Sequence, residues 1–336
     1  MLKIAIISES DFTVQGHGVH TAFVETVNGL KQRDDIVVTT NTWSSADIRH
    51  IHTVGPYSFA QLLFGRGKKI VSAHVVPESF VGSLAGARYW LPLARWYLRW
   101  FYNRAAMVIA VSDATKQQLQ AMGVSKPIEV IYNMIDGSKY AADAATKSQV
   151  RAKLGYKEDD WIVVSSGQVQ PRKRIDTFVA IAKLCPDMKF IWIGGIPFKN
   201  AAADFQGMKN IISAAPKNVH FTGVMSLDDV RQFYWAADVF VSTSDQETFG
   251  LSIIEAAASG LPVVLRDIHD YDSTFRVDAT TCSSDDEFAA AVRNLRSDRQ
   301  LYARKQTAAR RIAERFDSET ISKNLVSLYE RVLGSA

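Results

Sequence analysis

Short apolar runs rich in β-branched residues alternate with longer amphipathic stretches along the whole chain. This alternation is typical of parallel sheets whose strands are joined by helices. A first series of strands is expected at residues 4–8, 36–40, 48–55, 69–75, 107–112 and 128–133. A second series is expected at residues 161–167, 190–195, 219–223, 239–244 and 262–267. The pattern predicts an α/β protein with two doubly wound, Rossmann-like domains that face each other across a cleft.

The domain limits follow from a small, polar stretch between the two series, residues 136–150, which we interpret as a linker leading into a helix. We place an N-terminal domain at residues 1–145 and a C-terminal domain at residues 146–316. Residues 317–336 have the pattern of an amphipathic helix with Ser318 as its N-cap. This helix either completes the second domain or packs back on the first.

Composition excludes several classes of protein. The 336 residues carry 39 Lys and Arg against 35 Asp and Glu, a net charge of +4, and 47% of them are hydrophobic. These proportions exclude a disordered or collagen-like chain. Two cysteines, Cys185 and Cys282, are too few and too far apart for a disulfide framework or a zinc knuckle. No uncharged stretch reaches the ~20 residues of a membrane span, so we expect a cytoplasmic protein that is not threaded through a bilayer.

A glycine pair, Gly16 and Gly18, follows the first expected strand and precedes a helical pattern. Ligands of open α/β sheets bind beyond the carboxyl ends of the strands, and glycines there let backbone amides approach a phosphate. Thr21 stands where a dinucleotide-binding G-x-G-x-x-G motif needs its third glycine, and this argues against NAD. A turn without any ligand is the alternative.

Three adjacent cations, Arg172, Lys173 and Arg174, lie between the expected strand that ends at Gly167 and a helical run. A lysine supplies a point charge and arginines supply forked donors, which together suit a diphosphate. A run of charges is more often a solvated surface. Its place after a strand nevertheless favours a ligand site.

Two glutamates, Glu247 and Glu255, are separated by seven residues that include Phe249, Gly250 and Leu251. A helix beginning near Gly250 would leave Glu247 in the preceding loop and place Glu255 about a turn and a half inside. Amides at the helix start would then point at an anionic group, and the carboxylates would accept hydrogen bonds from sugar hydroxyls. The alternative makes Glu255 an exposed helix position and Glu247 a partner of the helix dipole.

The segment from Glu247 to Glu255 resembles the E-x7-E signature of the retaining glycosyltransferases of family 4, which have the two-domain GT-B fold. Residues 167–173 are similar to the G-x-x-x-x-R/K-K loop of that family, and residues 190–197 are similar to its glycine turn. Residues 219–264 follow the family pattern almost throughout. In the first half of the chain, two further segments fit the pattern, at residues 108–119 and 130–136.

The resemblance implies a role for each matching residue. Glu247 would contact the donor hexose, Glu255 would bind the ribose, and Arg172 and Lys173 would hold the diphosphate of a UDP-sugar. His74, after the fourth expected strand, resembles a histidine of the family that touches the donor sugar, although a lone histidine at a strand end is more often structural. The other implied donor-binding positions are Gly16, Gly18, Gly167, Gln168, Phe249, Gly250 and Leu251.

The family also implies transfer that retains the anomeric configuration and needs neither a metal ion nor a cofactor. Cations and helix termini would stabilise the negative charge that develops on the leaving diphosphate. Two positions depart from the family pattern: Gln168 replaces an arginine found in many relatives, and Arg174 replaces a glycine. These departures change the groups that surround the phosphates.

Residues from Arg88 to Arg104 interleave seven aromatic residues with four arginines. In a helix, Arg95 and Arg99 share one side, the tryptophans lie beside and opposite them, and Pro92 falls in the first turn. A cationic face joined to a Trp-rich face is typical of a helix in a membrane interface, which indicates an anionic membrane surface as a partner. The alternative is packing of these aromatics on the sheet. No nucleic-acid-binding module is recognised, so nucleic acid is not an expected partner.

A membrane-bound acceptor would be a lipid. Residues 14–23, residues 167–173 and the short chain are together similar to bacterial enzymes that extend glycosyl-diacylglycerols for the glycolipid anchor of lipoteichoic acid. We expect transfer of glucose or galactose from a UDP-sugar to monoglycosyl-diacylglycerol at the inner face of the cell membrane. The alternatives are transfer to diacylglycerol or another cell-envelope acceptor, and a non-catalytic subunit that stabilises a catalytic partner.

Overall fold

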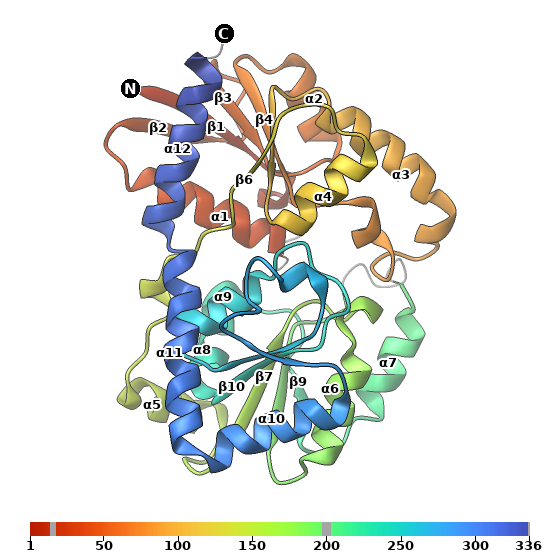
Figure 1. Cartoon of the computed structure of the whole chain (residues 1–336), viewed down its shortest axis with the longest axis vertical. Helices are drawn as coiled ribbons and strands as arrows, with labels where there is room; N and C mark the ends of the chain where they lie inside the picture. The colour runs from red at the N-terminus through yellow and green to blue at the C-terminus, as the bar shows by residue number, and fades with distance from the viewer. Residues whose placement is uncertain (14–17, 197–202, 335–336) are drawn as a thin grey trace. The chain divides into compact units, whose positions relative to one another are not determined.

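The computed structural model describes residues 1–13, 18–196 and 203–334 (Figure 1). The chain forms two compact units. Unit 1 comprises residues 1–80, 86–136 and 316–336, and unit 2 comprises residues 81–85 and 137–315. Each unit contains one parallel sheet covered by helices, as the alternating pattern of the sequence predicts.

Unit 1 contains a six-stranded parallel sheet with the order β2-β1-β3-β4-β5-β6. The strands are β1 (Leu2–Ile7), β2 (Ile36–Thr40), β3 (Ile48–Ile51), β4 (Lys68–Ala73), β5 (Met107–Ala110) and β6 (Ile128–Val130). The helices are α1 (Gly18–Lys31), α2 (Pro56–Phe64), α3 (Ala87–Tyr102), α4 (Asp113–Met122) and α12 (Ser318–Gly334), with short 3₁₀ turns η1 (Glu9–Asp11) and η2 (Pro77–Phe80).

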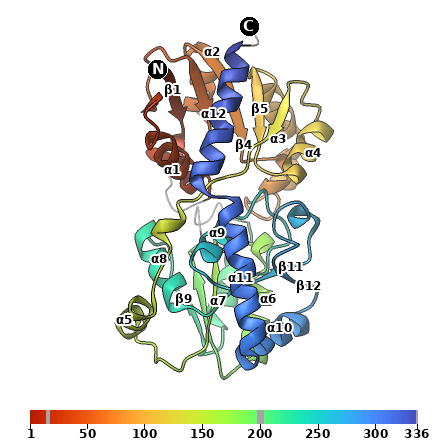
Figure 2. The same ribbon diagram turned by 60° about the vertical axis from the view of Figure 1, so that its left-hand side comes forward.

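The C-terminal helix α12 belongs to the core of unit 1. It lies beside α1 (Figure 2), where the small Gly29 faces Ser318 and Met134. Its apolar side chains, among them Leu325 and Leu328, are buried in one cluster with side chains of β1, β3 and β4. The expected cap is wrong by one residue, because Ser318 is the first residue of the helix and the Asp317 carboxylate accepts the amide hydrogen of Glu319 at 2.9 Å.

Unit 2 contains a second six-stranded parallel sheet with the order β12-β11-β10-β7-β8-β9. The strands are β7 (Ile162–Ser166), β8 (Lys189–Ile193), β9 (Val219–Phe221), β10 (Val239–Ser242), β11 (Val263–Arg266) and β12 (Thr280–Cys282). The helices are α5 (Ala144–Leu154), α6 (Ile175–Leu184), α7 (Phe205–Ser213), α8 (Leu227–Ala236), α9 (Leu251–Ala258), α10 (Asp285–Ser297) and α11 (Arg299–Arg315). The 3₁₀ turns are η3 (Gly137–Lys139), η4 (Pro171–Lys173) and η6 (His269–Tyr271).

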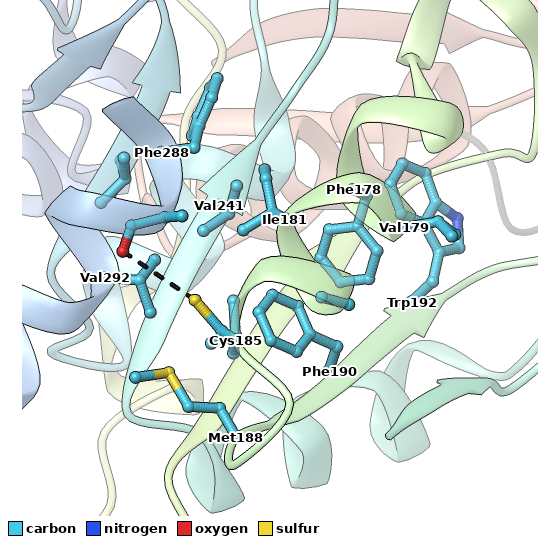
Figure 3. Close-up of a cluster of buried hydrophobic side chains, with 14 of the residues drawn as sticks. Phe178, Val179, Ile181, Cys185, Met188, Phe190, Trp192, Val241, Phe288 and Val292 are labelled. Atoms are coloured by element: carbon cyan, nitrogen blue, oxygen red, sulfur yellow. Dashed lines mark hydrogen bonds between the residues drawn. The ribbon is translucent and has the colours of Figure 1, made fainter. Parts of the chain in front are cut away.

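The core of unit 2 is built on aromatic side chains between the sheet and α6 and α10 (Figure 3). Phe178 packs edge-on against Phe190 and Trp192, with ring centroids 5.5 and 5.3 Å apart. The Trp192 indole also donates a hydrogen bond to the carbonyl of Gly167 at 3.0 Å. The core therefore fixes the start of the loop that follows β7.

The expected strands all form, and the edge strand β12 was missed because its three residues, Thr280–Cys282, are too short to give an apolar run. The helix over residues 88–104 also forms, but it begins at Ala87 after Gly86, whose φ is +65°. Pro92 is consequently inside α3 rather than in its first turn.

Candidate active site

Two glycines allow the loop after β7 to pass close to its neighbours. Gly167 has a φ of +149°, and a side chain there would lie 3.3 Å from Cε of Lys173. Gly194, at the end of β8, has a φ of +130°, and a Cβ on it would lie 2.2 Å from the carbonyl oxygen of Gly167. Both φ values lie in the region that favours glycine. The loop therefore places Lys173 directly beside the carboxyl end of β7.

Lys173 and Glu247 form a buried ion pair in unit 2. The Lys173 ammonium donates to Oε1 of Glu247, and Nη1 of Arg172 lies 3.7 Å from Oε2 of the same carboxylate. Arg172 is fixed by three further bonds: its Nε donates to the Ser83 hydroxyl at 2.9 Å and to Oε1 of Gln170 at 3.2 Å, and its Nη1 donates to the carbonyl of Gln246 at 3.1 Å. The loop after β7 and the loop after β10 therefore meet through three charged side chains.

Electrostatics keep this carboxylate ionised. Burial alone would raise the pKa of Glu247, but the charges of Lys173 and Arg172 outweigh burial and lower it below its ordinary value. Burial lowers the pKa of Lys173 from its ordinary value, although Glu247 opposes this change. A lysine that has lost most of its hydration is stabilised by additional negative charge, so the site favours an anionic ligand.

The third cation of the loop, Arg174, pairs with carboxylates other than Glu247. Arg174 has a φ of +49°, and its guanidinium pairs with Asp176 at 2.9 Å and with Asp245 at 3.3 Å. These carboxylates are half-exposed. Arg174 therefore belongs to a surface ion-pair group and is already neutralised, whereas Arg172 and Lys173 converge on Glu247.

Glu255 lies where the spacing predicts, as the fifth residue of α9, whose N-cap Gly250 has a φ of +103°. The alternative of an exposed helix position is wrong, because Glu255 is buried. Its Oε2 accepts the Tyr234 hydroxyl at 2.9 Å, and burial together with the Glu255 charge raises the pKa of Tyr234 well above its ordinary value. Tyr234 also bonds Ser166, the residue before Gly167. Glu255 is thus connected through Tyr234 to the last residue of β7, the strand that precedes the loop of Lys173.

The residues between the two glutamates divide into side-chain and backbone roles. Phe249 is buried and packs against Phe275 with centroids 5.7 Å apart, so its side chain belongs to the core and only its backbone is available to a ligand. Leu251 is the first residue of α9 and Gly250 precedes it. Amides at this helix start have no intrahelical partner and can bind an anion.

Two residues of the site were missed by sequence analysis. The Asp270 carboxylate accepts the backbone amide of Glu247 at 2.8 Å and so holds the loop that presents that glutamate. Asp270 lies in the turn that follows β11, and the rule that ligands bind beyond strand ends could have singled it out. Tyr234 lies on α8, and nothing in the local sequence signals its bond to Glu255.

The other expected positions belong to different units. Gln168 accepts a hydrogen bond from the Gln170 amide at 3.0 Å in unit 2. Gly18 is the first residue of α1 in unit 1, and Gly16 lies outside the described residues.

His74 follows β4 in unit 1 and belongs to a buried cluster of three histidines. Its Nε2 lies 3.1 Å from Nδ1 of His52, and their rings are stacked 5.1 Å apart. His52 is in turn 4.3 Å from His50, measured between ring centroids. His50 bonds the Tyr329 hydroxyl of α12 and the Ser72 hydroxyl, each at 2.7 Å. The position of His74 is therefore fixed by its hydrogen bond to His52, whose ring packs against His50, and His50 is in turn bonded to α12.

Helix α3 has one packed and one exposed side. Tyr102 and Phe101 are fully buried, and Trp100 stacks on Phe59 with centroids 5.3 Å apart. Packing on the sheet, the alternative raised from the sequence, therefore accounts for Phe101 and Tyr102, whereas Trp100 packs on helix α2. The opposite side exposes 93% of Tyr89, 65% of Leu93 and 63% of Trp96.

Over the described ranges, no group of three or more His, Cys, Asp or Glu side chains is placed to hold a metal ion. No described helix is both long and apolar enough to span a bilayer.

Comparison with known proteins places the chain in a family. Residues 146–312 match the family described as glycosyl transferases group 1, and residues 18–139 match glycosyltransferase family 4. The α-galactosylglucosyldiacylglycerol synthase of Streptococcus pneumoniae is 30% identical over 98% of this chain and 90% of its own. The processive diacylglycerol α-glucosyltransferase of Acholeplasma laidlawii is 26% identical over 80% of each chain.

Solved structures show the same fold. Anabaena HepE in complex with UDP-glucose superposes with a TM-score of 0.78, at 20% identity over 100% of both chains. The sucrose-phosphate synthase of Thermosynechococcus elongatus superposes with a TM-score of 0.80, at 17% identity over 100% of both chains. The chain belongs to the glycosyltransferases described by these two models, group 1 and family 4, and its two Rossmann-like units have the GT-B fold.

Proposed function

We propose that this glycosyltransferase transfers glucose or galactose from a UDP-sugar to monoglycosyl-diacylglycerol, with retained anomeric configuration, to build the glycolipid anchor of lipoteichoic acid. The observation that carries the proposal is the buried Lys173–Glu247 pair, with Arg172 beside it, at the carboxyl ends of β7 and β10. The S. pneumoniae relative, named for a diglycosyl-diacylglycerol, supports the acceptor. HepE, solved with UDP-glucose, supports the donor.

Cationic groups would bind the diphosphate of the donor, and carboxylates would bind its sugar hydroxyls. Lys173 and Arg172 supply positive charge for the diphosphate, assisted by the amides around Gly250. Glu247, held ionised by those cations, accepts hydrogen bonds from hydroxyls of the hexose, and Glu255 accepts those of the ribose. When the bond to the sugar breaks, the cations stabilise the charge on the departing diphosphate.

His74 would contact the transferred hexose. Its ring is held by His52, so it would meet the sugar without losing rotamer freedom. Gly16 and Gly18 would supply backbone amides to the donor. The loop cations replace a metal ion in this proposal, and 5 mM EDTA should leave the rate of transfer unchanged. A loss of activity on chelation, restored by Mg²⁺ or Mn²⁺, would contradict that part.

The enzyme would work on the inner face of the cell membrane, bound to anionic lipid through the segment from Arg88 to Arg104. The exposed Tyr89, Leu93 and Trp96 offer apolar side chains to the headgroup region. The arginines of the segment offer positive charge, apart from Arg95, which pairs with Glu78 at 2.7 Å. This attachment would be peripheral and sensitive to salt, because each basic residue contributes only ~1 kcal/mol near an anionic leaflet.

A second candidate acceptor is diacylglycerol itself, because the A. laidlawii relative is named for glucosyl transfer to diacylglycerol. Incubation with UDP-glucose or UDP-galactose and each defined lipid, followed by mass spectrometry, separates the candidates. We expect diglycosyl-diacylglycerol from the monoglycosyl lipid and no product from diacylglycerol. Product from diacylglycerol alone would favour the second candidate. Tight UDP binding without transfer or hydrolysis of any UDP-sugar would favour a non-catalytic subunit.

A further inference from the structure

An aromatic cluster occupies the carboxyl-terminal edge of the sheet in unit 1. Phe12 follows β1 and η1, Trp43 follows β2, and Tyr57 is the second residue of α2. β1 and β2 are parallel neighbours, so the loops after them emerge at the same edge. The Tyr57 ring lies edge-on to both others, with centroids 5.4 Å from Phe12 and 6.0 Å from Trp43. The three rings therefore form one contiguous group.

The central ring is held rigidly while the outer two face solvent. The Tyr57 hydroxyl donates to the carbonyl of Asn41 at 2.7 Å and accepts from the Gln61 amide at 2.8 Å. By contrast, 58% of Phe12 and 52% of Trp43 is exposed. Two large aromatic side chains kept in water on a fixed support are a feature of binding surfaces.

The polar groups beside these rings indicate what they bind. The Asp11 carboxylate, also exposed, accepts the Asn41 amide at 3.0 Å. Residues 8–13 and 40–46 contain the acids Glu9 and Asp11 and no Lys or Arg. The guanidinium of Arg49 reaches this loop, but it is fully buried and donates to the carbonyls of Thr42 and Ser44 at 2.7 and 2.8 Å. Glu9 is already engaged, since its carboxylate accepts the amides of Tyr57 and Ser58 at the start of α2. This leaves the Asp11 carboxylate as the charged hydrogen-bond acceptor next to the exposed rings.

This chemistry favours one occupant. The exposed Asp11 carboxylate disfavours phosphate groups and an anionic lipid surface, and the nearby Arg49 is buried and already bonded to backbone carbonyls. A carboxylate beside the rings also disfavours an acyl chain, because its desolvation would be uncompensated. A neutral sugar ring fits both the exposed aromatic rings and the Asp11 carboxylate, since its C–H face packs on aromatic rings and its hydroxyls donate to carboxylates.

We propose that Phe12 and Trp43, supported by Tyr57 and flanked by Asp11, bind the hexose ring of the glycolipid acceptor. The site rests on the proposed function for the identity of the acceptor. It deepens that function because it would make the enzyme recognise the first sugar of the acceptor rather than its acyl chains. Diacylglycerol, which lacks that sugar, would not use the site.

The test compares Trp43→Ala and Phe12→Ala with the control Phe64→Ala, which removes a ring that is 73% exposed at the other end of α2. Steady-state rates are measured with monoglucosyl-diacylglycerol in mixed micelles. We expect the KM for the glycolipid to rise about tenfold in both site variants and Trp43→Phe to restore most of the loss. The KM for the UDP-sugar and the affinity for UDP should not change, nor should Phe64→Ala have any effect.

Two results would overturn the site. One is an unchanged glycolipid KM in Trp43→Ala and Phe12→Ala. The other is a loss that does not depend on the sugar of the acceptor. It would appear as weaker sedimentation with anionic vesicles or, should the wild type also glycosylate diacylglycerol, as an equal loss with that lipid, and either would assign the rings to the membrane or to acyl chains. Thermal unfolding and UDP affinity equal to those of the wild type show that a variant is folded.

A separate measurement distinguishes failure of the site from failure of the proposed function. Saturation-transfer NMR with a short-chain alkyl α-glucoside reports sugar binding without catalysis. Signal transfer to the sugar C–H protons that disappears in Trp43→Ala supports the site even if the wild type makes no diglycosyl lipid. Transfer that persists in Trp43→Ala overturns the site even if glycolipid synthesis is confirmed.

Discussion

Lys173 and Glu247 depend on each other, because both are buried and each neutralises the other. Residue types and spacing predicted that both would serve a ligand, but they did not predict the ion pair. The pairing arises where the loops after β7 and β10 meet, and that meeting is a property of the sheet order. For the same reason the sequence did not predict the roles of Tyr234 and Asp270, because their hydrogen-bond partners are distant in sequence.

Removal of one member of this pair should affect both stability and activity. Lys173→Met leaves the buried Glu247 carboxylate with only the more distant Arg172 as a cation, so we expect ~3–5 kcal/mol of destabilisation in urea unfolding. Glu247→Gln should lower kcat at least ~100-fold. The double variant should regain part of the lost stability but no activity. Asp176→Asn, which removes an exposed pair with Arg174, is the control and should change stability by at most ~1 kcal/mol.

The control separates the consequences of burial from those of charge. If Lys173→Met were no less stable than Asp176→Asn, the pair would not be buried in solution. If Glu247→Gln kept full activity, its proposed contact with the donor would be wrong.

The histidine cluster should make stability depend on pH. Burial, with a smaller contribution from His74, lowers the pKa of His50 to about 3. The unfolded chain binds a proton near pH 6.5 while the folded chain does not, so stability is lost as pH falls from about 6.5 towards 3. The slope for one such histidine is ~1.4 kcal/mol per pH unit. His50→Gln should remove about that much of the slope in urea unfolding between pH 6 and 4.5.

The exposed His220→Gln is the matched control for this change. It should leave the slope unaltered. An unchanged slope in His50→Gln would show that His50 is accessible to protons in the folded protein.

At the scale of elements, α3 shows how one sequence pattern serves two purposes. Its periodicity predicted an amphipathic helix, and the packed side holds Leu98, Phe101 and Tyr102. Sequence alone did not show which aromatic side chains are buried and which are exposed, because large apolar side chains suit both packing on the sheet and contact with a membrane. The division became visible only from exposure, which leaves Trp96 and Leu93 on the outer side and puts Trp100 against Phe59.

The outer side of α3 should govern membrane binding. The double variant Leu93→Ser, Trp96→Ser should weaken sedimentation with vesicles containing about a third phosphatidylglycerol by at least ~10-fold, since buried apolar area drives interfacial binding. Added salt should weaken the remaining binding. Phe64→Ser, an equally exposed apolar site on α2, should bind as the wild type does. Equal binding by the double variant and the wild type would reject α3 as the attachment site.

At the scale of the whole molecule, the sequence predicted two parallel sheets because strand and helix patterns alternate without interruption. The placement of α12 was left open, because its apolar face would suit either unit. The structure resolves this, since Leu328 is fully buried in the cluster that includes Ile4 and Ile48 of unit 1. Tyr329 and His50, which are bonded, lie 279 positions apart. Contacts of such separation have no local sequence signal.

Each unit should respond separately to loss of core volume. Leu328→Ala should destabilise unit 1 by ~2–5 kcal/mol, and Leu295→Ala should do the same in unit 2. Hydrogen exchange followed by mass spectrometry checks this, with faster exchange in β1 and β3 for the first variant and in β7 and β8 for the second. Faster exchange in β7 and β8 for Leu328→Ala would show that the two cores are not independent.

The bond between α12 and the first sheet has a consequence for synthesis on the ribosome. The amino-terminal half emerges early, yet the segment from residue 316 that completes its core is translated last. Residues 137–315 can meanwhile close their own core. The first-made sheet therefore keeps an apolar face uncovered until the residues of α12 have left the ribosome, and in that interval nascent chains would depend on chaperones.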